Sequence, residues 1–95
     1  MFFLVEYTQQ GSAELRDQHR GTHIAYRKSL GSDLVLAGPL LDDDGNPNGS
    51  VVIIAAASRN AAETVAGRDP YLAAGVFALK SVRPLRIAAI APPQP

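Results

Sequence analysis

The chain has 95 residues, of which nine are basic and nine acidic, and it contains no cysteine. Because these charges cancel, the chain lacks the positive field that gives nucleic-acid-binding proteins their affinity for phosphate backbones, so we expect no nucleic-acid partner. The absence of cysteine excludes disulfides, thiol nucleophiles and thiolate metal sites, and it fits a reducing compartment. We therefore expect a cytoplasmic protein.

The size and apolar content of the chain predict a small domain that gains from a partner subunit. A chain of this length buries only about two-thirds of the surface that its unfolded form exposes. Apolar residues make up 46% of the chain and aromatic residues only 6%, so the core must be built largely from aliphatic side chains. The apolar run over 51–57 is far shorter than the roughly 20 residues that span a bilayer, and the N-terminal run has no basic leader. We expect neither a membrane partner nor a signal peptide.

The first third of the chain predicts a strand, a long helix and a second strand. Residues 2–8 are rich in aromatic and β-branched types and end at a polar turn, as strands do. Ser12 is a candidate N-cap and Gly31 a candidate residue after the C-cap, and together they bound a long helix. Residues 33–37 predict a second strand. Its pairing should stop at Gly38-Pro39, because proline cannot donate a hydrogen bond to a sheet.

The middle of the chain predicts a hairpin and two further helical segments. The turn formers over 42–49 lead into an apolar run over 50–56, which predicts a third strand paired with the second. Ser58 can cap a short helix over 59–67. Asp69-Pro70 then has the residue types of an N-cap followed by the first helical position, which predicts one or two more helical turns.

The end of the chain predicts a last strand and a tail. Residues 76–90 are β-branched and apolar, and Pro84 within them indicates either an edge strand or a bent one. The proline-rich residues 91–95 predict an extended or disordered tail. We therefore expect one domain over residues 1–90.

The resulting order, β-α-β-β-α-β, is that of a ferredoxin-like α+β domain. In this fold, right-handed crossovers place both helices on one face of a four-stranded antiparallel sheet. Within 50–56 the residues at both alternating positions are apolar. A sheet with one solvated face does not explain this pattern, so we expect two copies to pair through the uncovered face.

The first helix carries the candidate base. A helical wheel places one set of side chains toward the sheet, Leu15, Thr22, Tyr26 and Leu30, and a neighbouring stripe of Arg16, Arg20, His23 and Arg27. His23 lies at the boundary between the two sets. Because neutral imidazole titrates near neutral pH, His23 is a candidate general base, with a packed histidine as the alternative interpretation. His19 lies toward the buried side and favours a structural role.

The chain offers little to a metal ion. Two histidines and no cysteine argue against a transition-metal site within one subunit. Asp42-Asp43-Asp44-Gly45 superficially resembles a calcium loop, but it lacks the alternating ligand spacing and the later glutamate, so it predicts a solvated turn. The glycine-rich phosphate loops and the Gly-x-Ser-x-Gly elbow are also absent from the sequence.

Four short motifs occur in a fixed order: Arg20-x-x-His23, Gly38-Pro39, Gly49-Ser50, and Asp69-Pro70-Tyr71 with Ala74-Gly75-Val76. In this order and at these spacings the chain resembles the YciI-like (YCII-related) family up to about Pro84. The resemblance implies a ferredoxin-like domain that pairs its sheet with a second copy to form a dimeric α/β barrel. It also implies a His and Asp pair as the active site, and no cofactor.

The resemblance further implies a class of chemistry. The family looks related to muconolactone isomerase-like enzymes and includes dehydrochlorinase-type activity, which implies proton transfer on a small cyclic or phenolic compound. His23 would be the base, and Asp69 would fix its tautomer and stabilise the imidazolium. Arg20 would bind an anionic or phenolate oxygen, the Ser50 hydroxyl would stabilise developing charge, and Tyr71 would supply a wall or a second hydroxyl.

Each of these residues also has a structural interpretation that stays open at this stage. Asp69 can act only as a helix cap, and Ser50 can simply open a strand after a turn. The arginines of the first helix can form a solvated stripe paired with Glu14 or Asp17. The leading hypothesis is a cofactor-free enzyme for proton abstraction, isomerisation or elimination. The alternative is a dimeric module that binds a small molecule or another protein without catalysis.

Overall fold

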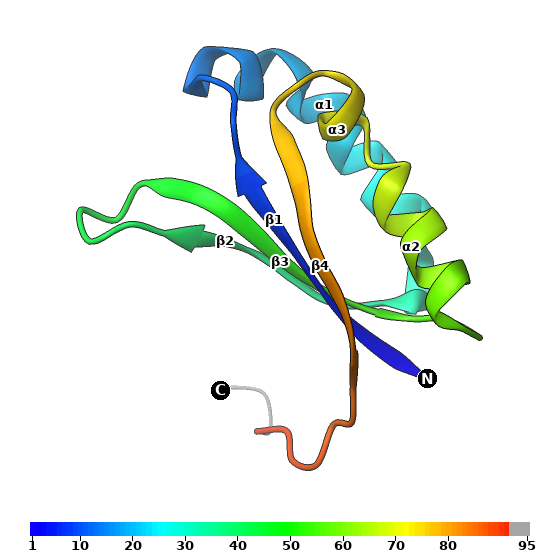
Figure 1. The fold of residues 1–95 in the computed structure, drawn as a ribbon. Helices are drawn as coiled ribbons and strands as arrows, with labels where there is room; N and C mark the ends of the chain where they lie inside the picture. Colours follow the sequence, from blue (N-terminus) through cyan, green and yellow to red (C-terminus); the bar gives the residue numbers. More distant parts are fainter. Residues whose placement is uncertain (92–95) are drawn as a thin grey trace.

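The computed structural model describes residues 1–91 and has the expected alternation of strands and helices (Figure 1). The elements in chain order are β1 (Phe2–Gln9), α1 (Ala13–Ser29), the 3-10 helix η1 (Gly31–Asp33), β2 (Leu34–Leu41), β3 (Pro47–Ala55), α2 (Arg59–Gly67), α3 (Pro70–Ala73) and β4 (Phe77–Leu85). The tail predicted over 91–95 lies almost entirely outside the described residues.

The four strands form one antiparallel sheet in the order β2-β3-β1-β4. All three α-helices lie on one face of this sheet, with α1 and the α2–α3 pair side by side (Figure 1). This arrangement confirms the predicted ferredoxin-like α+β fold.

The core lies between the sheet and the helices. Residues two apart in a strand point to the same face, and the buried residues of β1 are Phe3, Val5 and Tyr7. The register places Val52 opposite Val5 and Ile54 opposite Phe3, so β3 continues the same buried face. The rest of the core comes from the helices and the start of β4, namely Ala62, Ala66, Tyr71, Val76 and Phe77.

The predicted caps are confirmed for all three α-helices. Ser12 Oγ accepts the Leu15 N–H at 3.1 Å, and Ser58 Oγ accepts the Ala61 N–H at 3.1 Å. Asp69 caps α3, as described with the site below. Each such cap stabilises a helix by about 1 kcal/mol. Gly31, directly after the α1 C-cap, has a φ of 58°, a conformation that L side chains rarely adopt.

The prediction that the second strand stops at Gly38-Pro39 was wrong. β2 continues to Leu41, and Pro39 lies opposite Ser50 in the register with β3. β2 is an edge strand that pairs on one side only, so a proline whose nitrogen lies on the unpaired side removes no hydrogen bond from the ladder. β3 accordingly begins at Pro47, three residues earlier than predicted. This extension forms one wall of the candidate site.

The predicted turn of the hairpin is confirmed, whereas the last strand is shorter than predicted. The turn between β2 and β3 is closed by Asp42, whose Oδ1 accepts the N–H groups of Asp44 and Asn46, both at 2.9 Å. This is the predicted turn. β4 is the opposite edge strand and contains Pro84, which confirms the edge alternative, but it ends at Leu85 rather than at residue 90.

The face of the sheet away from the helices has an apolar row that no helix covers. Leu36, Ile53 and Leu4 lie in one row across β2, β3 and β1. Leu36 is 51% exposed. A groove of about 380 Å³ runs between this row and the segment 86–90 that follows β4. No helix within residues 1–91 is long and apolar enough to cross a membrane.

Candidate active site

His23 of α1 and Asp69, the residue before α3, meet in the interior although 46 positions separate them. His23 Nδ1 lies 2.8 Å from Asp69 Oδ1, and both side chains are buried. The same Oδ1 accepts the backbone N–H of Tyr71 at 3.0 Å, which is the α3 cap. One oxygen of Asp69 therefore both caps the helix and holds the imidazole, so the two interpretations of this residue do not exclude each other.

The imidazole plane is held by aromatic neighbours. The rings of His23 and Tyr71 stack with centroids 3.9 Å apart and an interplanar angle of 7°. Phe77 meets the imidazole edge-on, with centroids 6.0 Å apart. The Tyr71 hydroxyl donates to the Arg16 carbonyl at 3.0 Å, and burial raises the Tyr71 pKa, so this donor keeps its proton through the neutral range. Its hydroxyl is therefore already engaged within the protein, and its ring positions His23.

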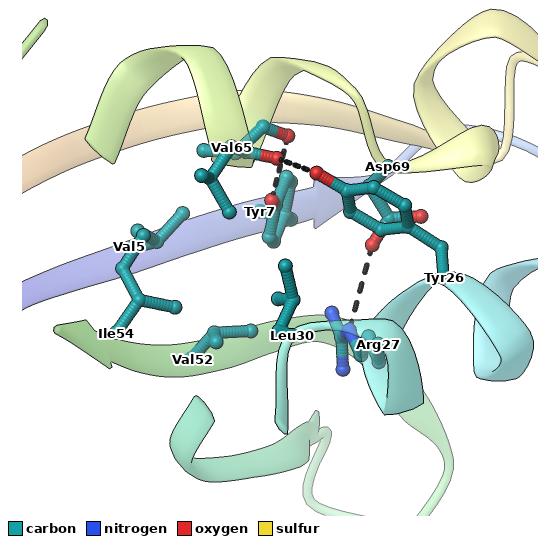
Figure 2. Close-up of a pocket in the computed structure, with 10 residues that line it drawn as sticks. Val5, Tyr7, Tyr26, Arg27, Leu30, Val52, Ile54, Val65 and Asp69 are labelled. Atoms are coloured by element: carbon teal, nitrogen blue, oxygen red, sulfur yellow. Dashed lines mark hydrogen bonds and ion pairs between the residues drawn. The ribbon is translucent and has the colours of Figure 1, made fainter. Parts of the chain in front are cut away.

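Arg27, which was predicted to belong to a solvated stripe, points into the site instead. Its Nε lies 3.4 Å from Asp69 Oδ2, and Figure 2 marks this ion pair with a dashed line. Its Nη2 donates to Ser50 Oγ at 3.2 Å. Ser50 in turn donates to the Gly38 carbonyl at 3.3 Å. Arg27 follows His23 by one helical turn on the same face, and this spacing is the signal that points to it.

A chain of contacts therefore links β2, β3, α1 and the residue before α3. It begins at Gly38 of the edge strand β2, passes through Ser50 of β3 and Arg27 of α1 to Asp69, and ends at His23. Each buried side-chain nitrogen or oxygen atom in this chain of contacts has a hydrogen-bond partner. The same is true of all other buried side-chain nitrogen and oxygen atoms of residues 1–91. Such a fully satisfied buried network fixes its members in one arrangement.

The site opens to solvent through a cleft of about 210 Å³. The cleft is lined by four of the five predicted site residues, Arg20, His23, Ser50 and Tyr71, and on the β2 side by Ala37, Gly38 and Pro39. Asp69 lies behind His23 and does not line it. Among the described residues, His23 makes one side-chain hydrogen bond, through Nδ1. Its Nε2 has no partner but is not fully buried, and His23 lines the cleft.

The remaining residues of α1 divide between the cleft and the surface. Arg20 is exposed and Arg16 is half-buried, and both line the cleft. The ion pairs among residues 1–91 are His23–Asp69, Arg27–Asp69 and Lys80–Glu6, so the expected pairing of the arginines with Glu14 or Asp17 does not occur.

The helical wheel was wrong for Thr22, which is exposed, because the buried stripe of α1 passes through His23. His23 is the one residue of this helix that is buried. The carboxylate of Asp69 lies on that side and gives the imidazole a partner, and a paired polar side chain can be buried where an unpaired one cannot. His19 is half-buried and does not line the cleft, which fits its structural role.

A small cavity of about 10 Å³ lies on the other side of Asp69 (Figure 2). Beside it the hydroxyl groups of Tyr7 and Tyr26 donate to the carbonyls of Ala66 and Val65, both at 2.8 Å. Burial raises the pKa of both tyrosines. These bonds attach the last turn of α2 to β1 and α1. Because Asp69 follows that turn directly, they also fix the position of the carboxylate.

The described residues contain no group of three or more His, Cys, Asp or Glu side chains that could hold a metal ion. The pair of His23 and Asp69 is what they offer for chemistry at this cleft. An imidazole with one nitrogen on a buried carboxylate and the other facing a cleft can accept a proton from a bound molecule and return it.

Comparisons with known proteins give a consistent result. Protein YciI of Escherichia coli O6:H1 (strain CFT073) and protein YciI of Shigella flexneri are each 33% identical to this chain over 94 residues, which cover 90% of this chain and 96% of each relative. Among solved structures, 5-chloro-2-hydroxyhydroquinone dehydrochlorinase (TftG) from Burkholderia phenoliruptrix AC1100, in complex with 2,5-dihydroxybenzoquinone, matches with a TM-score of 0.74 and 29% identity. The match covers 90% of this chain and 94% of that one.

The profile of the YCII-related domain matches residues 1–86, which is nearly the whole described chain. The motifs that suggested the resemblance all lie within this range. The chain therefore belongs to the YCII-related family.

Proposed function

We propose that this protein is a small enzyme that moves a proton on a cyclic or phenolic compound, with His23 as general base and Asp69 as its orienting partner. The observation that carries the proposal is the 2.8 Å contact between His23 Nδ1 and Asp69 Oδ1 behind a cleft that His23 lines. The likeness to a dehydrochlorinase of a hydroxyhydroquinone supports a ring-shaped, hydroxylated substrate.

The proposed reaction begins when a ring carbon or a hydroxyl group of the substrate gives its proton to His23 Nε2. The electron pair of the broken bond stays on the substrate as an enolate or phenolate. In an isomerisation the imidazolium returns the proton to another carbon, and in an elimination the electron pair expels a leaving group such as halide while the proton passes to water. Asp69 keeps the Nδ1 proton in place and stabilises the imidazolium during either route.

Arg20 and Ser50 have supporting roles in this proposal. Arg20 at the cleft edge binds an anionic or phenolate oxygen of the substrate by charge-assisted hydrogen bonds. Ser50 also lines the cleft, but its hydroxyl accepts from Arg27 and donates to the Gly38 carbonyl. We infer that Ser50 acts mainly by holding Arg27 against Asp69, and that Tyr71 acts as the positioning wall of the imidazole.

Hydrogen exchange with solvent tests the proposal without knowledge of the product. The protein is incubated in D₂O with a panel of hydroquinones, chlorinated hydroquinones and cyclic ketones, and loss of substrate protons is followed by NMR. We expect exchange with the wild type and at least about a hundredfold slower exchange with His23→Asn. His19→Asn is the matched control, because it changes the other histidine of the same helix outside the cleft.

Two results would count against the proposed catalytic function. Equal exchange by His23→Asn and the wild type would show that His23 is not the base. Compounds that bind in the cleft, with no exchange or turnover of any of them, would favour the non-catalytic binding module.

We also propose that the protein is a cytoplasmic homodimer. The row of Leu36, Ile53 and Leu4 on the uncovered face supports association, since a contiguous apolar patch of this kind is a feature of interfaces. The absence of cysteine from all 95 residues supports the reducing compartment.

A further inference from the structure

We propose that the cleft continues into a second, anion-binding subsite formed by Arg16 and Arg20, and that the natural ligand carries an oxyanion group, a carboxylate or a phosphate monoester, beside its reacting ring. This inference rests on the proposed function only for the statement that the ligand has a reacting ring. Binding of the oxyanion does not require catalysis.

The space for this group is a hollow of about 390 Å³ that adjoins the cleft. The two share Arg16, Arg20 and Pro39 among their lining residues, so one ligand can extend from one into the other. The hollow is also lined by Gln9 of β1 and Pro47 of β3. The cleft of about 210 Å³ by itself has room for little more than a single substituted ring.

Arg16 is held in position before any ligand arrives. Its Nη1 donates to Gln9 Oε1 at 2.7 Å, and its guanidinium carbon lies 5.6 Å from the centre of the Phe77 ring. Its backbone carbonyl accepts the Tyr71 hydroxyl. A guanidinium fixed in this way loses little side-chain freedom when it binds an oxyanion. The two side-chain contacts, with Gln9 and Phe77, distinguish Arg16 from a solvated surface arginine.

The charge at the hollow favours an anion. Neither Arg16 nor Arg20 belongs to an ion pair among the described residues, whereas Arg27 is engaged with Asp69. Asp17 is the one acidic side chain that lines the hollow, so two guanidinium groups face one carboxylate. Guanidinium forks bind carboxylate and phosphate by paired hydrogen bonds, which makes these two groups the matching ligand chemistry.

The spacing along α1 relates this subsite to the candidate base. Arg16 and Arg20 are one turn apart on the same face, and His23 follows Arg20 by three residues, a rise of about 4.5 Å. The three side chains therefore lie along one side of α1 and line the connected cleft and hollow, so a ligand that binds the arginines can also extend to the imidazole.

Binding measurements on matched compounds test the subsite. Dissociation constants are measured by NMR titration for 2,5-dihydroxybenzoate against 2,5-dihydroxybenzamide, and for 4-hydroxyphenyl phosphate against hydroquinone. We expect at least one anion to bind about tenfold or more tightly than its neutral counterpart, with a preference that falls as salt is added. The two arms distinguish a carboxylate from a phosphate ligand.

Variants test whether the two arginines cause the preference for an anion over its neutral counterpart. Arg16→Gln and Arg20→Gln should each reduce it, and the double variant should abolish it. Lys28→Gln is the matched control, because it removes a positive charge from the same helix at a residue that lines neither space. His23→Asn should retain the full preference even where exchange is lost, which separates this inference from the proposed catalysis. Equal affinity for every anion and its neutral counterpart, or a preference that survives the double variant, would overturn it.

Discussion

The Nε atom of Arg27 lies 3.4 Å from Asp69 Oδ2, while the other oxygen of the same carboxylate holds His23. Asp69 is 3% exposed, so its negative charge is balanced within the protein rather than by water. The carboxylate thus lies between a permanent cation and an imidazole that becomes a cation only when it accepts a proton.

Replacing Arg27 should therefore lower the stability of the folded protein. Arg27→Gln leaves Asp69 with His23 as its remaining charged partner, so we expect a loss of about 1.5–3 kcal/mol in the free energy of unfolding, measured with urea.

Arg27→Lys is the matched comparison for this prediction. Lysine keeps the charge but cannot contact Asp69 and Ser50 with two nitrogens at once. We expect the stability to fall by less than in Arg27→Gln. If the two variants lose the same free energy of unfolding, the charge of Arg27 does not contribute to stability.

Tyr71 offers a test of positioning against direct contact with substrate. Tyr71→Phe removes the bond to the Arg16 carbonyl but keeps the ring stacked on His23, so we expect a loss of about 1 kcal/mol in stability and nearly unchanged exchange at saturating substrate. Tyr71→Leu removes the stack and should lower the exchange rate with little change in KM. A Tyr71→Phe variant that loses exchange would instead make the hydroxyl a catalytic group.

Much of the fold followed from local patterns in the sequence. Ser12 and Ser58 were recognisable as caps because a hydroxyl before an apolar helical pattern can accept a free N–H of the first turn. Pro39 shows where such reasoning fails. A proline ends a central strand but is tolerated at an edge, and whether β2 lies at an edge depends on the order of all four strands.

The site was predictable in its members and less so in their connections. His23 and Asp69 were found through family motifs, since no periodicity links residues so far apart in the chain. Arg27 was missed because a basic residue beside an apolar stripe usually faces solvent, and only the position of Asp69 in space turns it inward. Tyr71 was placed correctly at the cleft, but the partner of its hydroxyl could not be read from the sequence.

The proposed dimer makes a separate prediction about the uncovered face of the sheet. Leu36→Glu puts a charge at one end of the row formed with Ile53 and Leu4. The Leu36 side chain is 51% exposed, so it contributes little to the core of the monomer. We expect the dimer to dissociate at least about tenfold more readily, measured by light scattering across a dilution series. Ala25→Glu adds the same charge to the exposed side of α1 and should leave the mass unchanged. A wild type that is monomeric at all concentrations would refute the dimer.

The three tyrosines predict how the protein responds to alkali. Burial raises the pKa of Tyr7, Tyr26 and Tyr71 above the ordinary value of 10.0, and for Tyr7 the nearby carboxylate of Asp69 adds to the effect. In the unfolded chain these groups lose their protons near pH 10, whereas in the folded chain they keep them to higher pH. Below pH 10 these groups should therefore not make the free energy of unfolding depend on pH. Above pH 10 the free energy of unfolding should fall as the pH rises.

Because the chain has three tyrosines and no tryptophan, tyrosinate absorbance near 295 nm can be followed directly. At pH 10 we expect about half of the tyrosine to be ionised in urea and clearly less than half in the folded protein. Tyr7→Phe should weaken the alkaline fall in stability, since Tyr7 carries the large shift and phenylalanine has no proton to lose. Ionisation of all three tyrosines near pH 10 with the circular dichroism of the folded state intact would show that their hydroxyl groups are not held by Ala66, Val65 and Arg16.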